Sequence, residues 1–204
     1  MEPWRTITAV AVPLAEANVD TGRIFPSRFL RKPRAAGYAQ FLFRDARYDE
    51  AGNERPECTL NRPAYRGARI LVAGADFGCG SSREAAVHAL VDTGFRCVIA
   101  PSFGDTFYSN CFPNGLLPVV LPAGAALDLQ RQLHEHPGAQ LSVDLERQSV
   151  QGPDGTACGF HIDAARKLRL TRGLDDAALA LENLPDIERF ERRYLADWSW
   201  AAPQ

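Results

Sequence analysis

The segment GCGSSRE at residues 78–84 follows the apolar run ILVA at residues 70–73. Residues 85–93 have the apolar pattern of a helix, so we expect a glycine-rich turn between a strand and a helix. The first N–H groups of a helix have no partner inside the helix, and together with the helix dipole they favour an anion. Two serines and Arg83 lie at the same corner. The segment therefore predicts a site for a carboxylate or a phosphate.

Within this turn, the role of Ser81 has two interpretations. Ser81 and Glu84 have the spacing of a capping box, in which the serine caps the helix and the glutamate bonds back to it. On that interpretation Ser81 is purely structural. Arg83 favours a ligand instead, because a cation in the first helical turn opposes the dipole unless both share an anion. Neither G-x-x-x-x-G-K-S/T nor G-x-G-x-x-G occurs here, so a nucleotide-phosphate loop is not predicted.

Length, composition and charge narrow the classes of protein. With 204 residues, 46% of them hydrophobic, the chain can bury a sizeable core. A net charge of −2 offers no electrostatic basis for binding nucleic acid. No apolar run approaches the roughly 20 residues that cross a bilayer, and the first residues do not resemble a signal peptide. We expect a cytoplasmic protein that binds neither nucleic acid nor membrane.

The cysteines argue against a metal site within this chain. Five are scattered along the sequence, and no two form a C-x-x-C pair. That pattern predicts neither a disulfide framework nor a self-contained zinc or iron–sulfur site. Cys79 is the exception of interest, since a helix N-terminus can lower the pKa of a thiol. A buried structural role and a reactive role both remain open for it.

Strands alternate with helices around the glycine-rich turn, which indicates a βαβαβ core with partly parallel strands. One domain is expected over residues 1–204, with a helical tail from about residue 163 that is broken near Gly173 and Pro185. Residues 27–47 are expected to form a solvated helix with an aromatic inner face, and residues 48–68 a long loop. The expected strands cover residues 7–14, 69–73, 97–100, 116–121, 140–145, 149–151 and 157–162; the expected helices before the tail cover residues 83–93, 103–111 and 122–136.

Several motifs together resemble one known family. DFGCGSSRE at 76–84, VIAPSFGDTFYSN at 98–110 and NGLLPV at 114–119 are similar to the small subunit of 3-isopropylmalate dehydratase, also called isopropylmalate isomerase. VPL at 12–14 and NVDT at 18–21 extend the resemblance, whose order and spacing hold over roughly residues 6–195. That subunit corresponds to the swivelling domain of the aconitase superfamily. The resemblance implies an α/β fold, a three-layer β/β/α swivelling domain with a mixed, partly parallel sheet.

The resemblance also implies a reaction. Such a subunit belongs to a hydro-lyase that interconverts 2-isopropylmalate and 3-isopropylmalate through a dehydrated intermediate, in leucine biosynthesis. A [4Fe-4S] cluster on a separate large subunit acts there as a Lewis acid, and none is expected on this chain. Carried over by position, Ser81 is the base that removes a proton from carbon, and Arg83 holds a substrate carboxylate. Further substrate-binding residues implied in this way are Gly80, Ser82, Thr21 and Arg28.

Three departures from the family pattern leave other functions open. Gly22 replaces a carboxylate that the family carries, Ala85 replaces a histidine, and Ser27-Arg28 stands where a lysine is usual. The chain could thus belong to a paralogous hydro-lyase for another hydroxy-dicarboxylate. It could also be a non-catalytic assembly or regulatory subunit.

Overall fold

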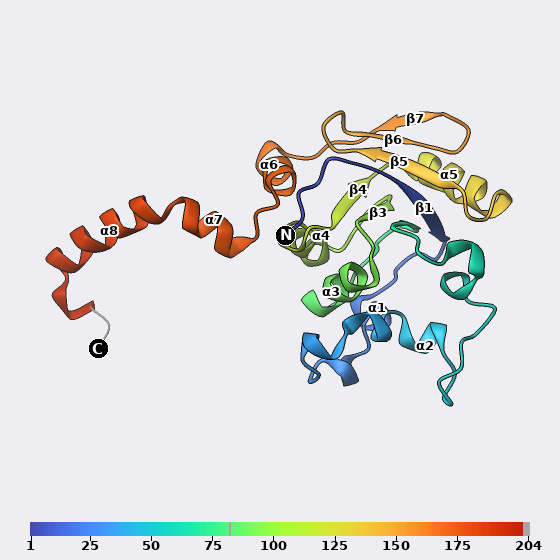
Figure 1. Ribbon diagram of the computed structural model, residues 1–204, viewed down its shortest axis with the longest axis horizontal. Helices are drawn as coiled ribbons and strands as arrows, with labels where there is room; N and C mark the ends of the chain where they lie inside the picture. The colour runs from blue at the N-terminus through green and yellow to red at the C-terminus, as the bar shows by residue number, and fades with distance from the viewer. Residues whose placement is uncertain (82, 202–204) are drawn as a thin grey trace.

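A seven-stranded sheet in the order β4-β3-β2-β1-β5-β6-β7 forms the centre of the protein (Figure 1). This computed structural model describes residues 1–81 and 83–201. Strands β1 to β4 run parallel, whereas β5, β6 and β7 pair antiparallel, and β1 joins the two parts. The strands are β1 (Thr6–Leu14), β2 (Ile70–Ala73), β3 (Cys97–Ala100), β4 (Leu117–Val120), β5 (Gln140–Asp144), β6 (Ser149–Gln151) and β7 (Ala157–Gly159).

Strand β1 changes partners along its length. Its first half, Thr6 to Val10, pairs with β5, and its second half, Ala11 to Leu14, pairs with β2. Pro13 lies in the second half, which has no strand partner on the β5 side, so the missing N–H of proline costs no hydrogen bond there. The central strands β2 and β3 are buried at every position, as their uninterrupted apolar sequence predicts for strands covered on both faces.

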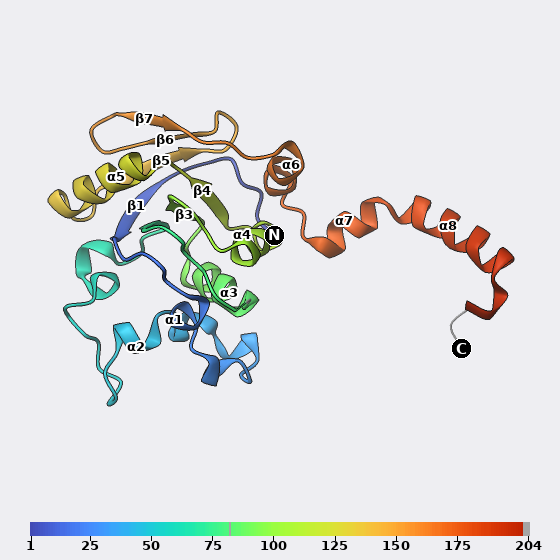
Figure 2. The same ribbon diagram turned by 180° about the vertical axis from the view of Figure 1, so that it is seen from behind.

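Helices cover the sheet on both sides (Figure 2). Helix α3 (Glu84–Thr93) is capped at its C-terminus by Gly94, whose φ of 106° allows its N–H to bond back to the carbonyls of Leu90 and Val91. The helices are α1 (Thr21–Ile24), α2 (Arg44–Arg47), α3 (Glu84–Thr93), α4 (Asp105–Cys111), α5 (Ala123–Glu135), α6 (Ala164–Arg172), α7 (Asp176–Glu182) and α8 (Leu184–Asp197). None of the helices in the described part of the chain is long and apolar enough to span a bilayer.

Two apolar clusters divide the core between the faces of the parallel strands. One face, with Leu71 and Val98, packs against α3 and α4 through side chains such as Leu90 and Phe107. The other face, with Val72 and Ile99, packs against α5 and against β5 and β6, which curl over it; their contacts include Leu133, Val143 and Val150. Antiparallel strands, parallel strands and helices thus form three layers, which confirms the expected β/β/α architecture.

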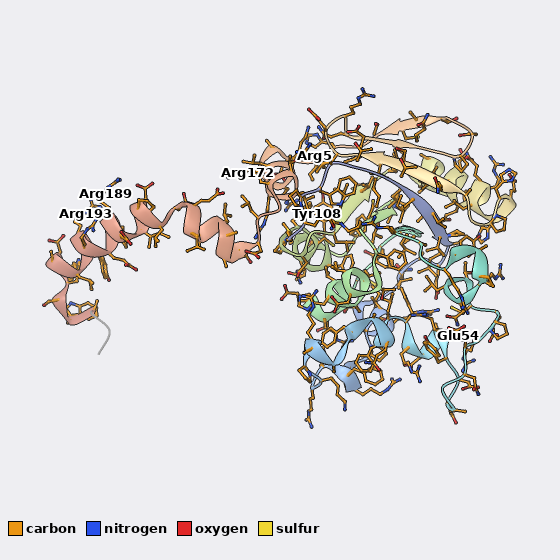
Figure 3. All side chains as sticks on the ribbon, in the orientation of Figure 1. Arg5, Glu54, Tyr108, Arg172, Arg189 and Arg193 are labelled. Atoms are coloured by element: carbon orange, nitrogen blue, oxygen red, sulfur yellow. The ribbon has the colours of Figure 1, made fainter. Side chains whose placement is uncertain are left out.

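The C-terminal residues 174–201, here called the arm, extend away from the sheet (Figure 1). No residue of α7 or α8 is buried. In Figure 3, Arg189 and Arg193 mark α8, at a distance from Tyr108 on α4. Large apolar side chains are exposed along the arm: Leu179, Leu181, Leu184, Ile187, Phe190, Tyr194, Trp198 and Trp200. Residues 164–197 form the helices α6, α7 and α8, with breaks after Arg172 and at Asn183; Pro185 lies in the first turn of α8 and does not itself break the helix.

Residues 27–47 differ from expectation. Instead of one solvated helix they form the short 3-10 turns Ser27–Phe29, Arg34–Ala36 and Tyr38–Phe41 and the helix α2. Pro33 and Gly37 interrupt the run, because proline provides no N–H and Gly37 has a φ of 84°. The aromatic inner face does exist, since Phe25, Phe29, Tyr38 and Phe41 pack on one another. Residues 48–68 are mainly loop, as expected, with two 3-10 turns at Thr59–Asn61 and Pro63–Tyr65.

Candidate active site

The glycine-rich turn lies at the carboxyl ends of the parallel strands, where three loops run side by side. The loop after β2 bonds to the loop after β1 through Asn18 N–H to Ala75 O, at 2.8 Å, and Gly78 N–H to Val19 O, at 2.8 Å. On its other side, Phe77 N–H bonds to Ser102 O at 3.1 Å, in the loop after β3. Carboxyl ends of parallel strands are where open α/β sheets place their ligands. The sheet thus fixes the turn on both sides.

Two features require glycine at position 78: a backbone conformation that other residues rarely adopt, and close packing against a neighbouring side chain. It is buried, and its φ of 75° lies in the left-handed region. A Cβ at this position would overlap the ring of Phe107 and would lie 2.6 Å from its Cβ. Gly80 also has a positive φ, 83°, but lies exposed at the tip of the turn. The two predicted glycine positions therefore differ: the first anchors the turn to α4, and the second opens the backbone to solvent.

The segment Asp20–Gly22 is hydrogen-bonded to the part of the glycine-rich turn that precedes Arg83. Thr21 is buried, and its hydroxyl donates to the carbonyl of Ser81 at 2.5 Å. Its N–H donates to Cys79 O at 3.0 Å. Asp20 caps α1 by accepting the N–H groups of Gly22, at 2.6 Å, and Arg23, at 3.0 Å. Thr21 thus contacts the backbone of Ser81, and a direct role of Thr21 in substrate binding stays a prediction.

Ser81 and Arg83 lie together at the exposed end of the turn. Ser81 is exposed and Arg83 is half-buried. Among the described residues, no carboxylate lies within 4.0 Å of the Arg83 guanidinium, and none donates to or accepts from the Ser81 hydroxyl. The proposed substrate contact Ser82 lies outside the described residues. A hydroxyl and a guanidinium therefore lie two residues apart in one turn, and their roles as base and carboxylate ligand stay predictions.

The predicted capping box is wrong. Helix α3 begins at Glu84, and the residue at its N-cap is Arg83, which makes no capping bond with its side chain. The Glu84 carboxylate accepts from the side chain of Asn114 at 2.9 Å and lies 3.7 Å from His88. The turn is held by backbone bonds to the neighbouring loops, so Ser81 is not needed as a cap. This leaves the Ser81 hydroxyl available for chemistry.

Arg28 contacts a different part of the surface. Its guanidinium forms a two-pronged ion pair with Asp45, and it packs 4.5 Å over the ring of Phe29. The hydrogen bond from Arg28 holds the pKa of Asp45 below its ordinary value. Arg28 lines a hollow with Arg44, Tyr48 and other residues of the 44–55 region, separate from the glycine-rich turn. Its predicted role in substrate binding has no support in these contacts.

A hollow of about 390 Å³ lies beside the turn and was not foreseen from the sequence. Gly78, Cys79 and Gly80 form one wall, and the start of α4 forms the other, including Asp105 and Thr106. Neither Ser81 nor Arg83 is among the residues that line it. The signal was present in the sequence, because residues 101–106 follow β3 and so reach the same edge of the sheet.

Cys79 does not have the thiol acidity that a helix N-terminus could give. Burial is the main cause that raises the pKa of its thiol, and the charges of Asp76 and Asp20 raise it further. Burial also raises the pKa of Cys97 and of Cys111. Within residues 1–81 and 83–201, no three His, Cys, Asp or Glu side chains gather closely enough to hold a metal ion. These residues do not fit an iron–sulfur cluster.

Comparisons with known proteins identify the family. The model of the aconitase C-terminal domain matches residues 1–124, and a model described as LeuD_N matches residues 128–164. The 3-isopropylmalate dehydratase small subunit of Dinoroseobacter shibae is 46% identical over 98% of this chain and 100% of its own length. That of Jannaschia sp. is 50% identical over 94% of this chain and 95% of its own.

A solved structure gives the same result. The crystal structure of 3-isopropylmalate dehydratase (leuD) from Methanocaldococcus jannaschii superimposes with a TM-score of 0.65 at 25% identity. It covers 90% of this chain and 99% of that protein. The family model, the relatives and the fold thus agree, and the chain belongs to the family of 3-isopropylmalate dehydratase small subunits within the aconitase C-terminal domain family.

Proposed function

We propose that this chain is the small subunit of a hydro-lyase that isomerises 2-isopropylmalate and 3-isopropylmalate by removing and re-adding water, in leucine biosynthesis. The observation that carries the proposal is the pairing of Ser81 and Arg83 in one exposed turn that backbone bonds and the Thr21 hydroxyl hold in place. Relatives with this function in their names share about half of the sequence over nearly its whole length, which supports it.

Ser81 is the proposed base. A serine hydroxyl is a weak base in water, so its alkoxide must be stabilised by nearby cations and dipoles and shielded from solvent. The Arg83 side chain supplies a positive charge in the same turn. Ser81 is exposed in this chain alone, so a second protein surface has to exclude water from it. The alkoxide would take the proton from the substrate carbon during dehydration, and the hydroxyl would return it to the intermediate during rehydration.

Arg83 is the proposed carboxylate ligand. Its guanidinium can form two parallel hydrogen bonds to a carboxylate, and among the described residues it has no competing acidic partner. Gly80, exposed at the tip of the turn, offers backbone that a substrate can approach closely. Ser82 is retained as a further candidate.

The partner is proposed to be a large subunit that carries a [4Fe-4S] cluster. When bound, that cluster would supply the Lewis acid for the hydroxyl that leaves. This chain would contribute the base, the carboxylate ligand and the wall of the site formed by residues 78–81 and Arg83. We further propose that the complex works in the cytoplasm and that residues 1–204 act as one domain within it.

The test is to co-express this chain with a large subunit of the family under anaerobic conditions and to assay hydration of isopropylmaleate. We expect turnover by the wild-type complex and a fall in kcat of about 10³-fold or more in Ser81→Ala, since loss of a catalytic acid–base group commonly costs 10²–10⁴-fold. Ser109→Ala, which removes another exposed serine hydroxyl on α4, is the matched control and should keep full activity.

The outcomes separate the alternatives. Turnover that survives Ser81→Ala would contradict Ser81 as the base. Activity on a different hydroxy-dicarboxylate but not on isopropylmaleate or its hydrates would indicate a paralogous hydro-lyase. A stable complex that is inactive on all of them would indicate an assembly or regulatory subunit.

A further inference from the structure

Gly22 lies directly against the guanidinium of Arg83. It is the second residue of α1, half-buried, and its N–H bonds to Asp20 Oδ1. An ideal Cβ at Gly22 would overlap Nη1 of Arg83 and would lie 3.3 Å from its Cζ and 2.9 Å from Asp20 Oδ1. The guanidinium therefore occupies the space in which the side chain of residue 22 would lie.

The obstacle at Gly22 differs in kind from those at other crowded glycines. At Gly104, a Cβ would meet the backbone carbonyl oxygen of Gly78 at 2.5 Å, and at Gly74 it would meet the backbone of Glu16, with the carbonyl carbon at 2.7 Å. Those glycines are required by the fold. At Gly22 the main obstacle is the end of a flexible side chain, and the residue lies in a helix without a positive φ. A side chain at position 22 would thus displace the Arg83 guanidinium and shift the Asp20 carboxylate slightly, whereas no backbone atom is among its three nearest obstacles.

We propose that Gly22 is a positioning residue that sets the place of the Arg83 guanidinium and, through it, which dicarboxylate the enzyme prefers. The specificity role rests on the proposed function of Arg83 as carboxylate ligand. Because a guanidinium binds a carboxylate in a fixed two-pronged geometry, moving it changes the distance it can span to the reacting carbon beside Ser81. Displacement of the guanidinium should therefore change kcat/KM by different factors for diacids that differ in side chain or in the spacing of their carboxylates.

Gly22→Ala tests the proposal against a control of the same type. Gly124→Ala changes the second residue of α5, where a new Cβ has nothing within 4 Å. In the complex with the large subunit, we expect Gly22→Ala to change the ratio of kcat/KM for 2-isopropylmalate and malate by about fivefold or more. Gly124→Ala should leave the ratio unchanged. An unchanged ratio in Gly22→Ala would overturn the specificity role.

A double-mutant comparison shows whether the effect passes through Arg83. In an Arg83→Lys background the contact is already altered, so Gly22→Ala should then change the ratio by less than twofold. The same change in both backgrounds would overturn the proposal, because Gly22 would then act on the substrate by another route.

A second measurement does not depend on turnover. In the ¹⁵N-labelled full chain, the Nε–Hε signal of Arg83 is the one that Arg83→Lys removes. Gly22→Ala should shift this signal and Gly124→Ala should not; an unmoved signal would contradict the contact itself. If the wild-type complex dehydrates neither diacid, the proposed function and the specificity role both fail, while this signal still decides whether Gly22 positions Arg83.

Discussion

Arg28 and Arg83 are both predicted to bind substrate, but the structure places them in different environments. Arg28 ends in an exposed, two-pronged ion pair with Asp45 and stacks over Phe29. Arg83 rests on the backbone of Gly22, and among the described residues it has no carboxylate partner. Arg28 thus already pairs with an anion, whereas the Arg83 guanidinium packs against Gly22 with no carboxylate partner among the described residues. An arginine can bind a substrate carboxylate only where no carboxylate of the protein already pairs with it.

Activity should separate the two arginines most strongly. Arg83→Ala removes the proposed carboxylate ligand, and truncating one partner of a close charged pair typically costs about 2–5 kcal/mol. We therefore expect kcat/KM of the complex to fall by about 10²–10³-fold. Arg28→Ala should reduce it by less than about threefold, since its charge is already matched within the chain. Equal losses in the two variants would break the distinction.

Substitution of a glycine should destabilise the turn near Arg83 more than the turn near Arg28. Gly78→Ala combines a positive φ with overlap of the Phe107 ring, so the free energy of unfolding should fall by about 3 kcal/mol. Gly52 also has a positive φ, 88°, but its nearest neighbour is the flexible end of Arg44 at 3.4 Å. Gly52→Ala should cost about 1 kcal/mol, from the backbone alone. Urea unfolding of both variants measures the difference, and equal losses would show that packing on Phe107 contributes nothing.

The Arg28–Asp45 pair should give the smallest effect, and one that depends on pH. The pKa of Asp45 is below its ordinary value of 3.8, mainly through the hydrogen bond from Arg28. A lowered folded-state pKa stabilises the fold above the unfolded value of about 3.8, and this contribution is lost as the pH falls through the folded value.

Because both side chains are exposed, a double-mutant cycle of Arg28→Ala and Asp45→Ala should give a coupling of at most about 1 kcal/mol at pH 7. The coupling should stay constant down to about pH 5 and shrink below pH 4. A coupling that grows on acidification would contradict the ion pair.

Local patterns in the sequence predicted most of the sheet, because buried parallel strands such as residues 97–100 are short apolar runs between turn residues. They also located the glycine-rich turn. What they could not provide are contacts between distant segments. Thr21 reaches the carbonyl of Ser81 across 60 positions, and Asp45 neutralises Arg28 across 17. The capping box failed for the same reason, because neighbouring loops hold the turn in place of Ser81.

Two tryptophans at the end of the arm make its environment measurable by intrinsic fluorescence. Trp4 is buried and donates its indole N–H to the carbonyl of Arg96, whereas the other two tryptophans, Trp198 and Trp200, are exposed at the end of the arm. The intrinsic fluorescence of the native chain is therefore the sum of emission from the buried Trp4 and from two water-exposed tryptophans about 200 residues away in sequence. Any surface that covers the arm would shift the emission to shorter wavelength without unfolding the body. Quenching by a polar agent such as acrylamide would then follow burial of the arm, with Trp4 as an internal reference.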